Sequence, residues 1–223
     1  MRTILAYGDS LTWGADPGQG MRLPWQDRWT TVLEEELNKT GPCRVICEGL
    51  HGRTTSFDDP AAAIDRNGAN WLPICLASHR PLDLVILMLG TNDLKPSIAG
   101  TAAAAADGMA RLAGIVRQSA AGPDGAPPLL IVAPPPLCAS ALPGGKPAKG
   151  RSIAESRLLA PLYQAVAKSN RARFFDAGTV CMASSVDGVH MDGSAHISLG
   201  MAMLGEIRRW RDHGCLNWQP LSL

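Results

Sequence analysis

The sequence has no long apolar run and no excess of charge of either sign. No apolar stretch approaches the roughly 18 residues that a membrane-spanning helix needs, so we expect no such helix. Lys and Arg number 21 against 20 Asp and Glu, which gives a formal net charge of +1. A chain this close to neutral has no overall electrostatic attraction to nucleic acid or to an acidic membrane surface. We therefore expect neither of them as a partner.

Features of exported proteins are also scarce. After Met1 and Arg2 the first apolar stretch covers only residues 4–7, which is too short for the core of a signal peptide, so we expect a cytoplasmic protein. None of the cysteines forms a C-x-x-C pair, and we interpret them as free, mostly buried thiols, with a disulfide framework as the alternative. The six cysteines are Cys43, Cys47, Cys75, Cys138, Cys181 and Cys215.

Several motifs of nucleotide, metal and hydrolase sites are missing. No G-x-S-x-G is present, which disfavours the nucleophile-elbow hydrolases. No G-x-G-x-x-G follows the first apolar run, and Gly145-Lys146 is followed by Pro147 instead of completing a phosphate-binding loop. Without an H-E-x-x-H motif or a Cys/His cluster, we expect no metal and no other cofactor.

What is present is a pattern of short apolar runs that alternate with segments of helical period. The expected strands are residues 3–7, 44–48, 83–89, 129–133 and 172–176. The expected helices are residues 28–39, 101–118, 152–169, where Pro161 should cause a kink or a split, and 197–210. Continuous apolarity in DLVILML indicates a central parallel strand that is covered on both faces. The alternation predicts a three-layer α/β/α fold with a five-stranded parallel sheet.

The length of 223 residues and the apolar fraction of 46% fit one globular domain over residues 1–223. Residues 134–151 are rich in Pro, Gly and Lys. We interpret this segment as a long surface loop inside that domain, because the strands and helices on both sides of it complete one sheet.

Polar residues gather directly after the expected strands. Ligand and active sites of parallel sheets lie beyond the carboxyl ends of the strands, so we expect these residues to meet at one edge. The segments are Gly8-Asp9-Ser10-Leu11, Gly49-Leu50-His51-Gly52, Gly90-Thr91-Asn92-Asp93 and, before the last helix, Asp187-Gly188-Val189-His190.

These residue types can form a nucleophilic site. A serine hydroxyl needs a base that takes its proton, and the base needs a carboxylate that orients it. Asp187 and His190 are three residues apart on one tight loop, which leaves the second ring nitrogen free for Ser10. We therefore assign Ser10 as nucleophile, His190 as base and Asp187 as the orienting acid.

The same segments supply donors for an oxyanion. The candidates are the backbone N–H groups of Ser10 and Gly52 and the side-chain amide of Asn92. Asp9 and Trp13, which flank Ser10, are assigned to the substrate-binding region. Asp9 cannot also reach the outer nitrogen of the imidazole, so a structural hydrogen-bonding role is its main interpretation. Trp13 either walls the acyl pocket or packs in the core.

From residue 4 to about residue 205 the chain resembles the SGNH/GDSL hydrolases, through GDSL at residues 8–11, Gly52, GTND at residues 90–93 and the D-x-x-H of residues 187–190. GDSLTWG, EGLHGRTT, DLVILMLGTND and DGVHMD look most like bacterial arylesterases that also have acyltransferase and perhydrolase activity. The resemblance implies a flavodoxin-like fold, hydrolysis of small acyl esters such as acetyl esters, acyl transfer to alcohols or peroxide, no metal, and a homo-oligomer. One departure is Glu48, where many members have Asn.

Structural roles and rival residues remain as alternatives to these assignments. Ser10 alone could cap a helix, and His196 is a rival base that we place in the first turn of the last helix. Asp93 is expected to brace its loop, and Arg53 either braces the Gly52 loop or binds an anionic substrate. The cluster of Lys146, Lys149 and Arg151 is expected to be solvated, with a subunit interface as its alternative.

Two other functions also remain. The same residues would serve a carbohydrate O-acetyl esterase, in which only the loops select a different leaving group. A catalytically silent binding module with the same fold is the second alternative, and an intact set of Ser10, Asp187 and His190 argues against it.

Overall fold

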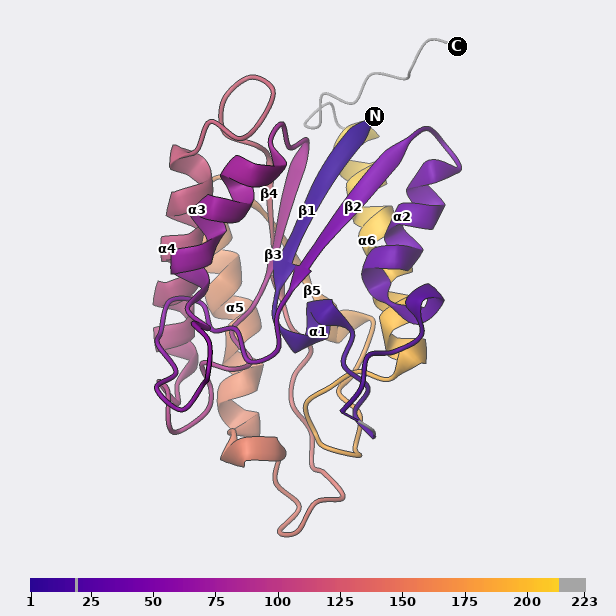
Figure 1. Cartoon of the computed structure of the whole chain (residues 1–223). Coiled ribbons are helices and arrows are strands. Elements are labelled where there is room, and N and C mark those ends of the chain that lie inside the picture. The colour runs from indigo at the N-terminus through magenta and orange to yellow at the C-terminus, as the bar shows by residue number, and fades with distance from the viewer. Residues whose placement is uncertain (19, 213–223) are drawn as a thin grey trace.

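Five parallel strands form one sheet at the centre of the computed structural model, which describes residues 1–18 and 20–212 (Figure 1). The strand order is β2-β1-β3-β4-β5. The strands are β1 (Arg2–Gly8), β2 (Cys43–Gly49), β3 (Leu84–Met88), β4 (Leu129–Ala133) and β5 (Arg173–Asp176). Every neighbouring pair is parallel, which confirms the predicted sheet and gives the flavodoxin-like order.

Helices cover both faces of the sheet. Helices α3, α4 and α5 pack on one face, and α2 and α6 pack together on the other (Figure 1). The helices are α1 (Ser10–Trp13), α2 (Trp29–Asn38), α3 (Gly68–His79), α4 (Ala102–Gln118), α5 (Ile153–Ser169) and α6 (Gly193–Asp212), with short 3₁₀ turns η1 (Trp25–Asp27), η2 (Ala148–Gly150) and η3 (Ala177–Thr179). This arrangement confirms the three-layer α/β/α fold.

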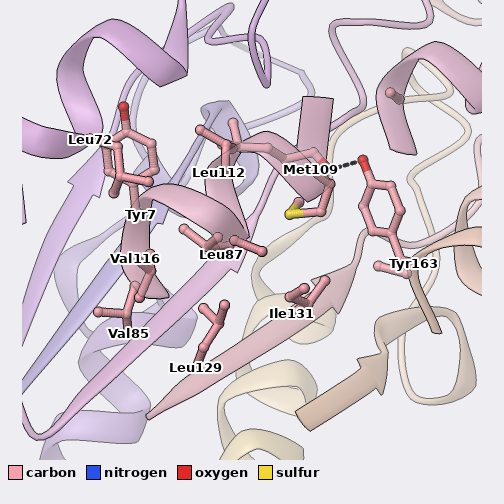
Figure 2. Close-up of a cluster of buried hydrophobic side chains, with 14 of the residues drawn as sticks. Tyr7, Leu72, Val85, Leu87, Met109, Leu112, Val116, Leu129, Ile131 and Tyr163 are labelled. Carbon is pink, nitrogen blue, oxygen red and sulfur yellow. Dashed lines mark hydrogen bonds between the residues drawn. The ribbon is translucent and has the colours of Figure 1, made fainter. Parts of the chain in front are cut away.

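The central strands bury both of their faces. In β1, Leu5 and Tyr7 join the core under α3, α4 and α5, whereas Ile4 and Ala6 join the core under α2 and α6. Figure 2 shows the first of these cores, where Leu87 of β3 lies among side chains from the sheet and from α4. Two buried faces explain why the strand sequences are continuously apolar instead of alternating.

Two helices differ from the sequence expectation. The patterns do not predict α3, because Asn67-Gly68 and Pro73 are signals of turns and helix ends, but the Asn67 side chain accepts a hydrogen bond from Ala69 N and caps this helix. Helix α6 begins at Gly193, four residues before the expected start at Ile197. Helix α5 is continuous through Pro161, so the helix is not split.

Residues 134–151 connect β4 to α5 at the carboxyl edge of the sheet (Figure 1). The middle of this loop is exposed, but Leu137 near its start and Arg151 at its end are buried. Its backbone pairs with the segment that precedes α6: Cys138 N donates to Gly188 O at 3.1 Å, and Ala148 N donates to Asp187 O at 2.9 Å. The loop is therefore anchored to the segment that carries the predicted acid and base.

The five cysteines in the described part of the chain are free, as predicted, and Cys215 lies outside it. Cys43, Cys75 and Cys181 are buried, whereas Cys47 and Cys138 are half-buried. Among the described residues, no helix is long and apolar enough to cross a membrane.

Candidate active site

Three predicted site residues meet at the carboxyl edge of the sheet. Ser10 is the first residue of α1, and its Oγ lies 2.9 Å from His190 Nε2. Asp187 Oδ2 lies 2.5 Å from His190 Nδ1. The two ring nitrogens of His190 therefore face a hydroxyl on one side and a carboxylate on the other, as in a Ser-His-Asp arrangement.

The loop of residues 187–190 holds the carboxylate and the imidazole together. Asp187 Oδ1 accepts hydrogen bonds from the backbone N–H groups of Val189 and His190, both at 2.9 Å. The tight turn needs glycine at position 188, where φ is +74° and a Cβ would lie 2.4 Å from Cys138 O. Burial alone would raise the pKa of Asp187, but hydrogen bonds from His190 and Val189 bring it below its ordinary value. The carboxylate therefore stays charged beside the ring.

The predicted oxyanion donors Gly52 and Asn92 lie on separate loops, after β2 and after β3. Asn92, which follows β3, is 3% exposed, and its Nδ2 donates to Arg53 O at 3.1 Å and toward Asp9 Oδ2 at 3.3 Å. Gly52, which follows β2, has a φ of +77°, and a Cβ there would lie 2.4 Å from Arg66 Nη1. A larger residue at position 52 would therefore be strained in its backbone and would displace Arg66.

Asp9 lies beneath the site instead of at its surface. It is fully buried, its Oδ1 accepts from Leu11 N at 2.9 Å, and its Oδ2 faces the Asn92 amide. Burial raises the pKa of Asp9 to about 6, against the effect of the Leu11 hydrogen bond and the charge of His190. This position fits the predicted structural hydrogen-bonding role of Asp9, and we correct its assignment to direct substrate contact.

Asp93 braces the loops around the site, as the sequence predicts, and Arg53 does the same, which is one of the two roles left open for it. Asp93 accepts hydrogen bonds from Thr55 N at 3.1 Å and from Thr55 Oγ1, which ties the loop after β3 to the loop after β2. Arg53 Nη1 donates to Gly8 O at 2.9 Å and to Glu48 O. Both side chains are at least 95% buried, so Arg53 serves as a brace and not as a ligand for an anionic substrate.

Glu48, which departs from the family pattern, points to a neighbouring helix. Its Oε1 lies 2.8 Å from Nε2 of His79, the last residue of α3. The pair links β2 to α3 and makes no contact with Ser10 or His190.

The His51 ring lies beside His190, and the Trp13 ring packs against His51. The ring centroids of Trp13 and His51 are 4.3 Å apart in an edge-on arrangement, and those of His51 and His190 are 6.2 Å apart. Both Trp13 and His51 are half-buried, so Trp13 belongs to the rim and not to the core. Sequence reasoning overlooked His51, although its place next to Gly52 was the available signal.

Arg151 is a second residue that the sequence reasoning missed, because the prediction of a solvated side chain is wrong. Lys146 and Lys149 are exposed as expected, but Arg151 is only 7% exposed. Its Nη2 donates to Asn92 Oδ1 at 2.8 Å, and its Nε donates to Thr91 O at 2.8 Å. The composition of residues 134–151 indicates a solvated loop, and nothing in the sequence distinguishes Arg151 as the cation whose side chain is buried.

His196, the rival base, lies in the first turn of α6 as predicted and is fully buried. Its Nδ1 accepts a hydrogen bond from Trp29 N at 3.4 Å, and Ser10 Oγ is in contact with His190 instead. Burial lowers the pKa of His196 to about 4. The ring is therefore neutral at physiological pH and serves the packing of α6 on α2.

No group of three or more His, Cys, Asp or Glu side chains in the described part of the chain could hold a metal ion. The chemistry available at this edge of the sheet is that of a hydroxyl, an imidazole, a carboxylate and several N–H donors. That set suits nucleophilic attack on a carbonyl carbon.

Comparisons with known proteins agree with this chemistry. The profile of the GDSL-like Lipase/Acylhydrolase family matches residues 6–198. A solved structure described as a putative arylesterase from Agrobacterium tumefaciens str. C58 is 54% identical, with a TM-score of 0.88 over 94% of this chain and 99% of that chain. A carbohydrate acetylesterase family member from Sinorhizobium meliloti is 43% identical, with a TM-score of 0.85 over 94% and 98%. The native M. smegmatis aryl esterase is 40% identical, with a TM-score of 0.85 over 94% and 99%. No curated protein matches the chain.

The depressed pKa of His196 predicts that acid destabilises the fold. In the unfolded chain this ring takes up a proton near its ordinary pKa of 6.5, but in the folded chain it does so only near 4. Between these values the unfolded state binds more protons, so His196 lowers the free energy of unfolding by up to about 1.4 kcal/mol per pH unit as the pH falls.

Urea unfolding of the wild type and of His196→Leu, from pH 8 to pH 4.5, measures this effect. The difference at pH 8 is the baseline for the substitution itself, since both side chains are neutral there. The wild type should lose stability relative to the variant as the pH falls below 6.5. Parallel curves would contradict a buried neutral His196.

Proposed function

The chain belongs to the GDSL-like lipase/acylhydrolase family and hydrolyses esters, and we propose that it does so through a covalent acyl-enzyme on Ser10. The observation that carries the proposal is the pair of contacts made by His190, with Nε2 2.9 Å from Ser10 Oγ and Nδ1 2.5 Å from Asp187 Oδ2. This geometry lets the ring take a proton from the hydroxyl while the carboxylate fixes its orientation.

In the proposed first step, Ser10 Oγ attacks the ester carbonyl carbon and its proton passes to His190 Nε2. Asp187 keeps its hydrogen bond to Nδ1–H and stabilises the positive charge on the ring. The carbonyl oxygen becomes an oxyanion that accepts hydrogen bonds from Ser10 N, Gly52 N and Asn92 Nδ2. Each such donor typically lowers the barrier by about 2.7–4 kcal/mol.

Collapse of this intermediate breaks the ester bond, and the leaving alcohol takes the proton from His190. Water then attacks the acyl-enzyme with His190 as its base and releases the acid and free Ser10. We propose short acyl groups as substrates, because the half-buried His51 ring lies beside His190 and is backed by the Trp13 ring, which packs edge-on against it.

Three further features belong to the same proposal. An alcohol or a peroxide can take the acyl group in place of water, copies of the chain assemble into a homo-oligomer, and the enzyme acts in the cytoplasm. The first two rest on the likeness of the four sequence blocks to bacterial arylesterases, and the third on the five free cysteines of the described residues, which are usual in a reducing compartment.

A second candidate function is the removal of acetyl groups from carbohydrates. Its support is the 43% identity to the Sinorhizobium meliloti carbohydrate acetylesterase family member, which extends over 94% of this chain. The attack on the carbonyl is the same in both cases, and only the alcohol that leaves is different.

Labelling with an organophosphonate tests the nucleophile. The wild type should take up one phosphonyl group per chain, found by mass spectrometry on the peptide that contains Ser10, and Ser10→Ala should take up none. Ser198→Ala, which removes an exposed hydroxyl of α6, is the matched control and should be labelled at the wild-type rate. Full labelling of Ser10→Ala would overturn the assignment, and an unlabelled wild type would favour the silent binding module.

Asp187→Asn tests the tautomer of His190. The Asn Oδ1 can still accept from the backbone N–H groups of Val189 and His190, so the loop keeps its shape. The new amide, however, places a donor against His190 Nδ1, so the ring proton moves to Nε2. A protonated Nε2 can no longer accept the proton of Ser10. We expect kcat for p-nitrophenyl acetate to fall by about 10⁴.

Asp192→Asn is the control for that substitution. It makes the same change in an exposed side chain that accepts from Ala195 N at the start of α6, where Asn caps a helix as well as Asp does. Its kcat should stay within about twofold of the wild type. A loss of less than tenfold in Asp187→Asn would remove Asp187 from the mechanism.

Paired substrates separate the two candidate functions. We expect kcat/KM for p-nitrophenyl acetate to exceed that for an acetylated xylose by at least about tenfold, because an activated aryl leaving group needs no sugar-binding loops. Both rates should vanish in Ser10→Ala, which shows that they come from one site. A higher kcat/KM for the acetylated sugar would identify the carbohydrate acetylesterase function instead.

A further inference from the structure

Arg151 is a buried cation that contacts the side-chain amide of Asn92, the proposed oxyanion donor, and forms no ion pair with a carboxylate. It is 7% exposed, and its donors reach three oxygens: Thr91 O at 2.8 Å, Asn92 Oδ1 at 2.8 Å and Ala148 O at 2.5 Å. Among the described residues, none of the ion pairs includes Arg151. The charges of Asp9 and Asp187 favour the guanidinium from a distance, but neither carboxylate pairs with it directly, and a buried charge without a direct partner is costly.

The contact with Arg151 decides which way the Asn92 amide points. Arginine has five N–H donors and no acceptor, so the atom of Asn92 that faces it must be Oδ1. The Nδ2 group therefore points the other way, where one hydrogen is held by Arg53 O at 3.1 Å. The second hydrogen makes a longer hydrogen bond of 3.3 Å to the buried Asp9 Oδ2, and this is the weaker of the two bonds that an incoming oxyanion would have to replace.

We propose that Arg151 is a positioning residue that sets both the orientation and the donor strength of the Asn92 amide. This inference rests on the oxyanion role proposed for Asn92. Without the guanidinium the amide could rotate and present Oδ1 to the developing negative charge, which would repel it. A charged donor on Oδ1 also polarises the amide, because hydrogen bonds in a chain strengthen one another in a buried site.

The same guanidinium connects the proposed oxyanion donor Asn92 to the loop that carries Asp187 and His190. Ala148 O accepts from Arg151 Nη1, and Ala148 N donates to Asp187 O at 2.9 Å. A continuous path of hydrogen bonds therefore leads from the Asn92 amide through Arg151 and Ala148 to the backbone of Asp187. Through this path, the loop of residues 134–151 sets the distance between the oxyanion donor and the acid–base pair of its own chain.

A double-mutant cycle tests the proposal. Arg151→Met, which removes the donors but keeps an unbranched side chain, and Arg151→Lys are each made in the wild type and in Asn92→Ala. Activity on p-nitrophenyl acetate is normalised to the sites that an organophosphonate titrates, so unfolded protein does not count. In the wild type, Arg151→Met should lower kcat by about 10- to 100-fold with KM within about threefold, because the interaction matters in the transition state.

In the Asn92→Ala background, Arg151→Met should change kcat by less than about twofold, because the amide that Arg151 positions is absent. Arg151→Lys restores the charge with a less complete set of donors, so it should recover part of the lost kcat, and its effect should also disappear in Asn92→Ala. Lys146→Met, an exposed cation on the same loop, is the control and should leave both constants unchanged. If Arg151→Met does not fold, the cycle with Arg151→Lys decides.

Losses that multiply in the double variants would mean that Arg151 acts independently of Asn92 and would overturn the proposal. A raised KM with unchanged kcat would overturn it as well, because that result assigns Arg151 to substrate binding. If Asn92 is not an oxyanion donor, the result is a different one. In that case Asn92→Ala itself leaves kcat unchanged, whatever residue stands at position 151.

Discussion

The hydrogen bond between Ser10 Oγ and His190 Nε2 joins positions 180 residues apart, and the common direction of the strands makes it possible. Strand β1 ends two residues before Ser10, and the segment after β5 leads through η3 to His190. Because all five strands are parallel, both connections leave the sheet at the same edge. Reversing either strand would place the hydroxyl and the imidazole at opposite ends of the molecule.

Beneath this contact lies a layer of buried charged side chains. Asp9, Asp93, Arg53 and Arg151 are each at most 7% exposed, and their hydrogen bonds go mainly to the loops after β1, β2 and β3. Burial raises the pKa of both aspartates to about 6, which is the electrostatic sign of their desolvation. An apolar layer of similar volume would often be at least as stable, so the value of these groups lies in the orientations that they fix.

The sequence is informative where structure depends on local patterns. Short apolar runs predicted all five strands, and the polar residues after them predicted that Ser10, Asp187 and His190 would meet. Helix α3 escaped prediction because a cap at Asn67 outweighs the turn signals around it. Arg151 and His51 escaped for another reason: their partners, Asn92 and Trp13, lie 59 and 38 positions away, and no spacing rule links residues through a folded loop.

The loop between β4 and α5 has a consequence for anyone who wishes to redesign the enzyme. Backbone hydrogen bonds from Cys138, Ala141 and Ala148 reach Gly188, Ser185 and Asp187 on the segment before α6. A graft that replaces this loop with a relative's version would also remove the support of the acid and base. The loop and the segment before α6 therefore have to be exchanged together, so that the carboxylate and the imidazole keep their backbone support.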